Sequence, residues 1–324
     1  MTTIKLSINS CWRVVVATFI ALSVSIQCAQ ADLPSKATAA GDSITMGFAA
    51  DCTGNIWFWD LFCLLGGDQP EHSWFDGSDS SVYSVHDRYK NLDSNISANK
   101  NAAASGSEMR GGGNNFTTQA NNIVAQTNKP DHVEVLLGGN DLCNRGCTDP
   151  ANCDDPIYTD SQWRSSVRDG LDVLVGNLPT GSTVHLGSVP RVQDLRAAGL
   201  ALQSKKSWTV NCESLWSTFG VCRIATNGGT MNGESFQQRY NGVSQAQRRY
   251  NEILAEEAAA YNSNSNGRND RSIEVVADYV DENTPSAGTY VFGPDDIDGG
   301  DCFHPSIRGQ NLVADILWNS NPDN

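Results

Sequence analysis

Short strand-like runs alternate with longer helical stretches along most of this chain. The pattern predicts strands at 36–40, 97–103, 132–137, 183–189 and 272–277, and helices at 55–65, 116–127, 161–178, 235–261 and 307–318. Strands that alternate with helices favour a parallel sheet with helices on both faces. The sequence therefore predicts an α/β fold, a three-layer αβα sandwich with a mostly parallel central sheet.

The first 31 residues have the features of a secretory signal peptide. They contain Lys5 and Arg13 but no acidic residue, then an apolar run at 14–26, then the small-residue sequence Ala-Gln-Ala that ends at Ala31. The apolar run is shorter than the roughly 18 residues that span a bilayer, and no later stretch is long enough. We expect cleavage after Ala31, a secreted or periplasmic location and no stable membrane insertion. Acylation of Cys28, as in a lipoprotein, is the alternative.

Residues 32–324 are expected to form one domain, because they can bury a large core and contain no internal repeat or obvious linker. The net charge of the whole chain is −15 at pH 7, and loss of Lys5 and Arg13 with the signal makes it more negative. Such a surface repels phosphate backbones and anionic membranes. We therefore expect no nucleic-acid partner.

The cysteine count predicts disulfides. Of the ten cysteines, Cys11 and Cys28 lie in the signal region, which leaves an even number in the mature chain. An even count in an exported chain is typical of disulfide bonding. A zinc site at the crowded cysteines 143, 147 and 153 is the alternative, but no C-x-x-C spacing or paired histidine accompanies them.

Short sequence spacing favours local bridges, Cys52 with Cys63 and Cys212 with Cys222. One of the crowded cysteines would then bond Cys302. The segment 208–233 is rich in Trp, Cys, Gly and Asn and interrupts the strand and helix alternation. It is expected to be an inserted loop.

An aromatic cluster, Trp57 to Trp59, lies in the first predicted helix. Core packing is the simpler interpretation of these side chains, and contact with substrate is the alternative.

Polar residues lie at the ends of three predicted strands: the first ends in 41–43, the second runs into 101–106, and the third runs into 138–141. Ligands of open α/β sheets bind at the carboxyl ends of the strands. A serine nucleophile needs a base, a group that orients the base, and donors for the oxyanion. Ser43 and Asn140 stand at two of these strand ends. Both residue types are also common at helix caps and turns, which is the alternative interpretation.

Asp301 and His304 lie three residues apart, just before the last predicted helix. One tight turn brings residues i and i+3 within about 7 Å. The carboxylate can then reach Nδ1 of the imidazole and leave Nε2 facing Ser43. Of the five histidines, only His304 has a carboxylate near it in sequence and also lies just before a predicted helix. The others are expected to be surface or strand residues: His72, His86, His132 and His185.

Four motifs together resemble the sequence blocks of the GDSL/SGNH hydrolases, in the same order and over nearly the whole mature chain. They are Gly41-Asp42-Ser43, Gly106, Gly139-Asn140-Asp141 and Asp301-x-x-His304. The resemblance implies an SGNH, flavodoxin-like domain over 32–324, with Ser43 as nucleophile and Asp301 and His304 as its acid-base partners. It also implies an oxyanion hole made by the Ser43 N–H, the Gly106 N–H and the Asn140 side chain. No cofactor or metal is implied.

The sequence departs from the family in two places. Ile44 stands where Leu is usual, which should be harmless. Glycines 111–113 follow Gly106 closely, and one of them could be the oxyanion donor instead. The blocks around Asn140 and His304 and the Cys-rich insertion look most like the phospholipase B branch.

The resemblance implies a secreted serine ester hydrolase that cleaves acyl esters, with lipid or lysophospholipid esters as substrates, through an acyl-enzyme on Ser43. A polysaccharide O-acetyl esterase and an inactive lipid- or carbohydrate-binding module are the alternatives. The acidic segment 295–301 could suggest calcium, but an EF-hand loop begun at Asp296 would place Gly300 and Ile307 at ligand positions. Only a looser calcium site stays open.

Overall fold

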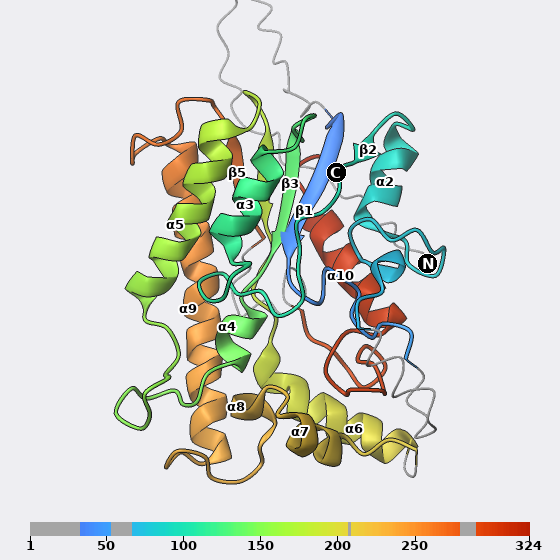
Figure 1. The fold of residues 1–324 in the computed structure, drawn as a ribbon, viewed down its shortest axis with the longest axis vertical. Coiled ribbons are helices and arrows are strands. Elements are labelled where there is room, and N and C mark those ends of the chain that lie inside the picture. The colour runs from blue at the N-terminus through green and yellow to red at the C-terminus, as the bar shows by residue number, and fades with distance from the viewer. Residues whose placement is uncertain (1–32, 53–66, 207–208, 279–289) are drawn as a thin grey trace, which may run out of the picture. The chain divides into compact units, whose positions relative to one another are not determined.

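Five parallel strands form one sheet within residues 33–52, 67–206, 209–278 and 290–324, which the computed structural model describes (Figure 1). The strands are β1 (Lys36–Gly41), β2 (Ser97–Ala98), β3 (His132–Leu136), β4 (Thr183–Leu186) and β5 (Glu274–Ala277). Their order is β2-β1-β3-β4-β5, and each neighbouring pair is parallel. The predicted α/β class is confirmed.

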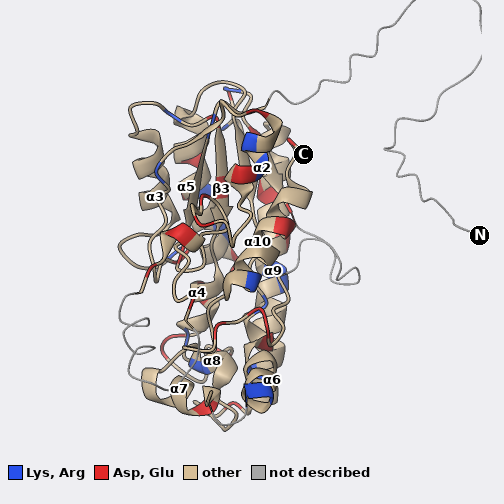
Figure 2. Cartoon of the chain, turned by 90° about the vertical axis from the view of Figure 1, so that its right-hand side faces the viewer, with Lys and Arg blue, Asp and Glu red and all other residues tan. Residues whose placement is uncertain are grey.

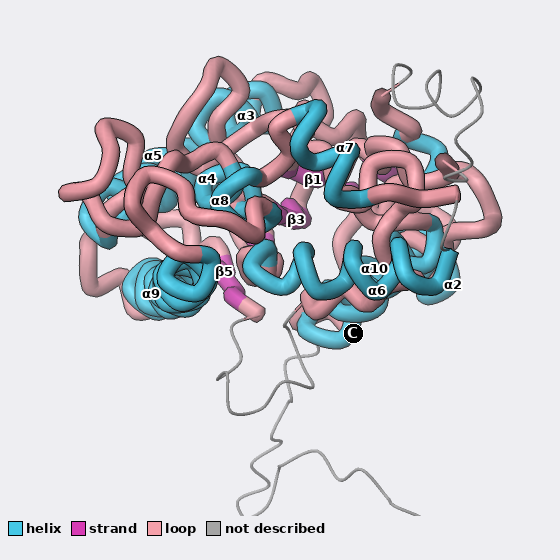
Figure 3. The backbone as a smooth tube through the Cα atoms, turned by 90° about the horizontal axis from the view of Figure 1, so that it is seen from below, coloured by secondary structure: helices cyan, strands magenta, loops and turns pink. Residues whose placement is uncertain are grey.

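Helices cover both faces of the sheet, as Figures 1 and 3 show. One face carries α3 (Phe116–Val124), α5 (Asp160–Asn177) and α9 (Phe236–Asn262), and the other carries α2 (Val85–Leu92) and α10 (Ile307–Ser320). Four of these helices agree with the sequence prediction to within a few residues, and α2 was not predicted. The expected signal peptide, the expected helix at 55–65 and its aromatic cluster lie outside the described residues.

Polar caps determine where the long helices begin. Thr159 and Ser235 each form a capping box with the glutamine three residues later. Ser306 accepts a hydrogen bond from the Gly309 N–H and begins α10 two residues after His304. The direction of α10 and the position of His304 are thereby linked.

Three strands are shorter than predicted by two residues or more. β2 ends at Ala98, β4 ends at Leu186, and β5 begins at Glu274. The segment after β2 still donates to β1, from Ala102 N–H to the Ala39 carbonyl and from Ala104 N–H to the Gly41 carbonyl, but without regular ladder spacing. This irregular continuation carries the chain to Gly106.

Further helices lie at the edge where β1 and β3 end, and Figure 3 shows α4, α6, α7 and α8 there. They are η1 (Pro70–His72), α4 (Gly139–Cys143), η2 (Val192–Asp194), α6 (Leu195–Lys206), α7 (Cys212–Phe219) and α8 (Arg223–Thr226). The prediction that 208–233 is a loop was wrong, because α7 and α8 lie within it. Asn211 caps the start of α7, and Gly220 ends it with φ of 68°. The sequence prediction did not recognise these two cap residues, which mark where α7 begins and ends.

The described disulfides differ from the local pairing expected from the sequence. They join Cys143 to Cys222, Cys147 to Cys153, and Cys212 to Cys302. The predicted Cys212–Cys222 bridge was wrong, because the eight residues of α7 span about 12 Å and separate the two cysteines. A disulfide needs Cα atoms only about 4.4–6.8 Å apart.

The crowded cysteines at 143, 147 and 153 are all oxidised and so are not zinc ligands. The expected link from this group to Cys302 was also wrong, since Cys302 bonds Cys212 of α7. The predicted partner of Cys52, Cys63, lies outside the described residues.

Acidic and basic residues are interspersed over the helices rather than separated (Figure 2). In the part of the chain that is described, no helix is both long enough and apolar enough to cross a membrane.

Candidate active site

Ser43 lies in the turn that follows β1, at the carboxyl edge of the sheet. The buried side chain of Gln119 holds the strand end by accepting from the Gly41 N–H at 2.7 Å and donating to the Gly41 carbonyl at 2.8 Å. A Cβ at Gly41 would lie 1.9 Å from Thr45 Oγ1, so only glycine fits there. The turn that presents Ser43 is therefore closely packed.

The Ser43 hydroxyl, the His304 ring and the Asp301 carboxylate form one hydrogen-bonded chain. Ser43 Oγ is 2.8 Å from His304 Nε2, and His304 Nδ1 is 2.5 Å from Asp301 Oδ2. Because Nδ1 donates to a carboxylate, Nε2 is left unprotonated and can accept the Ser43 proton. The structure brings together the three residues that the sequence proposed.

The Asp301 carboxylate also shapes the turn that carries His304. Its Oδ1 accepts from the Phe303 N–H at 2.9 Å and from the His304 N–H at 3.0 Å. The His304 ring lies between Phe48 and Phe303, with ring centroids 4.6 and 4.7 Å away. These contacts restrict rotation of the imidazole.

Gly106 and Asn140 line the same cavity as Ser43 and His304. Asn140 Nδ2 donates one hydrogen to the Ser107 carbonyl at 3.0 Å, which leaves its second amide hydrogen available. Among the described residues, the backbone N–H groups of Ser43 and Gly106 donate to no protein acceptor. The cavity is therefore lined by three residues that each have a free N–H donor.

Glycines 111–113 do not line this cavity. Gly111 packs against the Glu108 carboxylate, which would lie 2.1 Å from a Cβ at that position. Gly106 has φ of 79°, and no neighbouring atom lies within 4 Å of the place that a Cβ would take there. Of these glycines, Gly106 is the one that the structure places beside Ser43.

Two buried carboxyl groups adjoin the site, and sequence reasoning assigned a role to neither of them. Asp141 accepts from the Met109 N–H at 2.6 Å and the Arg110 N–H at 3.0 Å, and so ties α4 to the segment after Gly106. Burial raises the pKa of Asp141 to about 7. Burial also raises the pKa of Asp42 to about 6, against the opposing effects of the Ile44 N–H and His304.

The cavity beside Ser43 has a volume of about 430 Å³ and a largely apolar wall. Phe48, Phe303, Val221 and Phe219 supply its apolar side chains, and the last two belong to the segment from α7 to α8. Phe219 is 59% exposed, so an aromatic ring stands at the cavity mouth.

A second and much narrower cavity, of about 30 Å³, shares Ser43, Asn140, Phe303 and His304 with the first. Most of the rest of its wall is apolar, and Asp42, Gly139 and Arg191 complete it. The apolar side chains are Ile44, Pro190, Val192, Leu195, Phe292 and Pro305.

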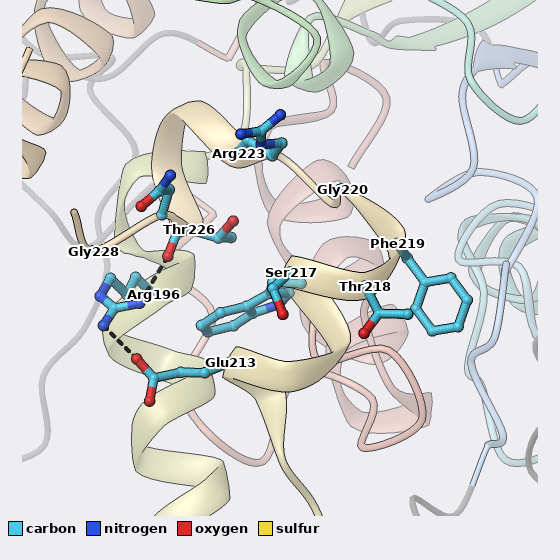
Figure 4. A pocket seen from close by; sticks show the side chains of 11 residues that line it. Arg196, Glu213, Ser217, Thr218, Phe219, Gly220, Arg223, Thr226 and Gly228 are labelled. Carbon is cyan, nitrogen blue, oxygen red and sulfur yellow. Dashed lines mark hydrogen bonds and ion pairs between the residues drawn. The ribbon is translucent and has the colours of Figure 1, made fainter. Parts of the chain in front are cut away.

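A third cavity of about 490 Å³ shares only Phe219 and Gly220 with the cavity beside Ser43 (Figure 4). Its wall is polar. Arg196 donates to Glu213 and to the Thr226 carbonyl, at 2.7 Å in each case. This cavity contains none of the residues of the hydrogen-bonded chain.

The remaining candidates lie elsewhere. His132 and His185 are buried in β3 and β4, whereas His72 is buried in η1, and His86 is partly buried in α2. Two carboxylates of the acidic segment 295–301 form ion pairs with basic side chains, Asp295 with Lys205 and Asp296 with Arg308. No group of three or more His, Cys, Asp or Glu side chains in the described ranges is arranged to hold a metal ion.

Comparisons with known proteins add the family. One solved crystal structure is similar with a TM-score of 0.39 and 12% sequence identity, and the match covers 90% of this chain and 97% of that chain. A search of curated proteins finds no match. The family model for GDSL-like lipases and acylhydrolases matches residues 38–317, a range that includes Ser43, Gly106, Asn140, Asp301 and His304. The chain therefore belongs to the family of GDSL-like lipases/acylhydrolases.

Proposed function

We propose that this protein hydrolyses carboxylic esters through an acyl-enzyme on Ser43. The observation that carries the proposal is the hydrogen-bonded chain from Ser43 Oγ through His304 to Asp301, with separations of 2.8 and 2.5 Å. Ser43 is nearly buried but opens onto both cavities beside His304. A substrate carbonyl placed there meets the hydroxyl and its base together.

In the first half of the reaction, Ser43 Oγ attacks the ester carbonyl while His304 Nε2 takes the hydroxyl proton. Asp301 holds the imidazole in the correct tautomer and stabilises its positive charge. The carbonyl oxygen becomes an oxyanion, and the Ser43 N–H, the Gly106 N–H and the Asn140 amide are the proposed donors to it. His304 then gives its proton to the departing alcohol, and the acyl group remains on Ser43.

In the second half, a water molecule attacks the acyl-enzyme. His304 takes a proton from the water and returns it to Ser43 Oγ as the carboxylic acid leaves. The same oxyanion donors serve both halves. Each step uses residues of this chain only.

The substrate class that we favour is lipid or lysophospholipid esters. The larger cavity has three phenylalanines and a valine in its wall, and one of these rings is exposed at its mouth. Each methylene of an acyl chain buried there contributes about 0.8 kcal/mol to binding. The resemblance to the phospholipase B branch supports the same choice and remains a prediction.

Export through a signal peptide at 1–31 is part of this proposal. Disulfides form and persist in oxidising compartments, and Cys143–Cys222, Cys147–Cys153 and Cys212–Cys302 are compatible with a secreted or periplasmic location.

A second candidate is an acetyl esterase that acts on polysaccharide side chains. The observation that favours it is the narrow cavity of about 30 Å³, which admits only a short acyl group. The alcohol part of the substrate would then occupy the larger cavity. An inactive binding module is disfavoured, because the whole hydrogen-bonded chain is present.

A chain-length series tests the proposal and separates its two forms. We would measure kcat/KM for acetyl, butyryl and octanoyl p-nitrophenyl esters and for lysophosphatidylcholine, with fluorophosphonate labelling of Ser43 as the readout of an active serine. Labelling of Ser43, with kcat/KM that rises from the acetyl to the octanoyl ester, supports the lipid substrate. A steep preference for the acetyl ester supports the acetyl esterase. Absence of labelling would leave the inactive module as the better interpretation.

A further inference from the structure

The turn between Asp301 and His304 is held in an unusual backbone conformation. Cys302 has φ of 57°, in the left-handed region that non-glycine residues seldom occupy. Such a residue persists only where its surroundings fix it from several sides. The conformation matters, because it lets the Asp301 carboxylate bond the Phe303 and His304 N–H groups of the same turn.

Three attachments hold Cys302 in place. Its N–H donates to the Asp298 carbonyl at 2.9 Å, and its side chain is bonded to Cys212. Its carbonyl accepts from Trp216 Nε1 at 3.1 Å. Two of the three attachments come from α7, which is more than 80 residues away in sequence.

Trp216 is itself held firmly. Its side chain is buried against α6, where a Cβ at Gly199 would lie 2.3 Å from the indole ring. Trp216 lines the cavity of about 490 Å³ and is absent from the walls of both cavities at Ser43. It therefore contacts no reacting atom.

We propose that Trp216 is a positioning residue for the catalytic base. Its indole N–H fixes the Cys302 carbonyl, and through this peptide group it keeps the Asp301 to His304 turn in the conformation that points His304 Nε2 at Ser43. The effect on turnover rests on the proposed function. The effect on the His304 ring does not, since it concerns the free protein.

The test is Trp216→Phe, which keeps an aromatic ring against Gly199 and removes the N–H. A lost buried hydrogen bond and a small displacement of the base should lower kcat about 10-fold, with little change in KM. Tyr261→Phe is the matched control, because it also removes a buried aromatic donor, to Asp172, and keeps the ring. Tyr261 lies at the end of α9, beside the start of β5 and away from Ser43.

A second readout follows His304 directly. The chemical shift and the solvent exchange rate of the Nδ1 proton shared with Asp301 would be measured by NMR, assigned with a His304→Asn sample. In Trp216→Phe this proton should shift and exchange faster. Tyr261→Phe should leave both properties as in the wild type. A merely structural tryptophan would change stability without changing this proton.

Wild-type kcat and a wild-type His304 signal in folded Trp216→Phe would overturn the inference, as would equal losses in the Tyr261→Phe control. If Trp216→Phe does not fold, Gly199→Ala is the substitute, because its methyl group displaces the indole while the N–H remains. Changed His304 signals together with an inactive wild type would refute the proposed ester hydrolysis and leave the positioning role of Trp216 intact.

Discussion

The site contacts that could be predicted join residues close together in the sequence, and those that could not be predicted join residues far apart in it. Asp301 and His304 are three residues apart, so one turn sufficed to relate them, and Ser43 follows a recognisable strand. Gln119 reaches Gly41 across 78 residues, and Trp216 reaches Cys302 across 86. Contacts of this kind depend on the packed fold, and a single sequence contains no local pattern that indicates them.

The Asn140 amide has one hydrogen bonded to Ser107 and one directed at no described acceptor. We predict that Asn140→Ala lowers kcat by about 10² to 10³, the usual loss for one oxyanion donor, with a smaller change in KM. Steady-state kinetics on the best ester of the chain-length series is the measurement. A change confined to KM would make Asn140 a substrate-binding residue instead.

Gly106 and Gly112 make a matched pair for the question of which glycine donates. Both have positive φ, 79° and 73°, and neither has an atom within 4 Å of where a Cβ would stand. Alanine at either position should therefore cost a similar free energy of unfolding, about 1 kcal/mol. Only Gly106 lines the cavity beside Ser43.

We predict that Gly106→Ala lowers kcat at least about 10-fold, because the strained backbone moves its N–H away from the oxyanion. Gly112→Ala should keep wild-type kcat with similar destabilisation. Kinetics and urea unfolding of both variants would be compared. If Gly112→Ala lowered kcat and Gly106→Ala did not, the oxyanion donor would lie among glycines 111–113.

At the scale of elements, the segment from α7 to α8 is linked by disulfides to two parts of the site, α4 and the turn that carries His304. Cys212 at the start of α7 bonds Cys302, and Cys222 before α8 bonds Cys143 of α4, next to the Asn140 turn. Short spacing in the sequence favoured the wrong partner for Cys212, because the intervening helix was not recognised. Eight cysteines allow 105 pairings, and the packing of α7 determines the partners of Cys212 and Cys222.

Two disulfides of very different loop length allow a controlled test of this connection. Cys212–Cys302 spans 90 residues and Cys147–Cys153 spans six. In the chain-entropy description, removing the first should lower the free energy of unfolding by about 4–5 kcal/mol and removing the second by about 2 kcal/mol.

We further predict that the double variant Cys212→Ala/Cys302→Ala loses kcat, because the turn at His304 loses an attachment. The double variant Cys147→Ala/Cys153→Ala should keep it. Urea unfolding and kcat would be measured for both pairs. Full activity in the first pair would mean that the disulfide stabilises the chain without positioning the base.

At the scale of the molecule, alternation of strands and helices was enough to predict the parallel sheet and the helices that cover it. Two features were not predictable from it. One is the short α2, with a single capping box at Ser84 and Asp87 as its signal. The other is a charged cluster inside the fold, where His132 and Glu134 of β3 and His185 of β4 are all fully buried. The ion pair between His185 and Glu134 depends on the packing of β4 beside β3, and the sequence contains no local pattern that indicates it.

This buried cluster joins the sheet to the C-terminal segment. Glu134 is 2.9 Å from His132 and 2.8 Å from His185, and His132 is 3.1 Å from Asp323. Burial opposes charge on His132, but hydrogen bonds and attraction from Asp323 and Glu134 outweigh it and raise its pKa to about 9. Burial likewise opposes charge on Glu134, but the two histidines lower its pKa to about 2. The pKa of His185 is raised as well, by Glu134 against the effect of burial.

These shifts predict how stability depends on pH. A raised pKa in the folded state means that the contribution of His132 is complete below its unfolded pKa of about 6.5 and is lost as the pH rises through about 9. The contribution of Glu134 is complete above its unfolded pKa of about 4.5 and is lost only as the pH falls through about 2.

We therefore expect the free energy of unfolding in urea to fall between pH 6.5 and 9. His132→Asn should be less stable than the wild type at pH 6.5 and should lose less stability over the same interval. A wild-type curve that is flat from pH 6.5 to 9, or one that His132→Asn reproduces in full, would mean that His132 is neutral in the fold and that Asp323 and Glu134 do not hold its proton.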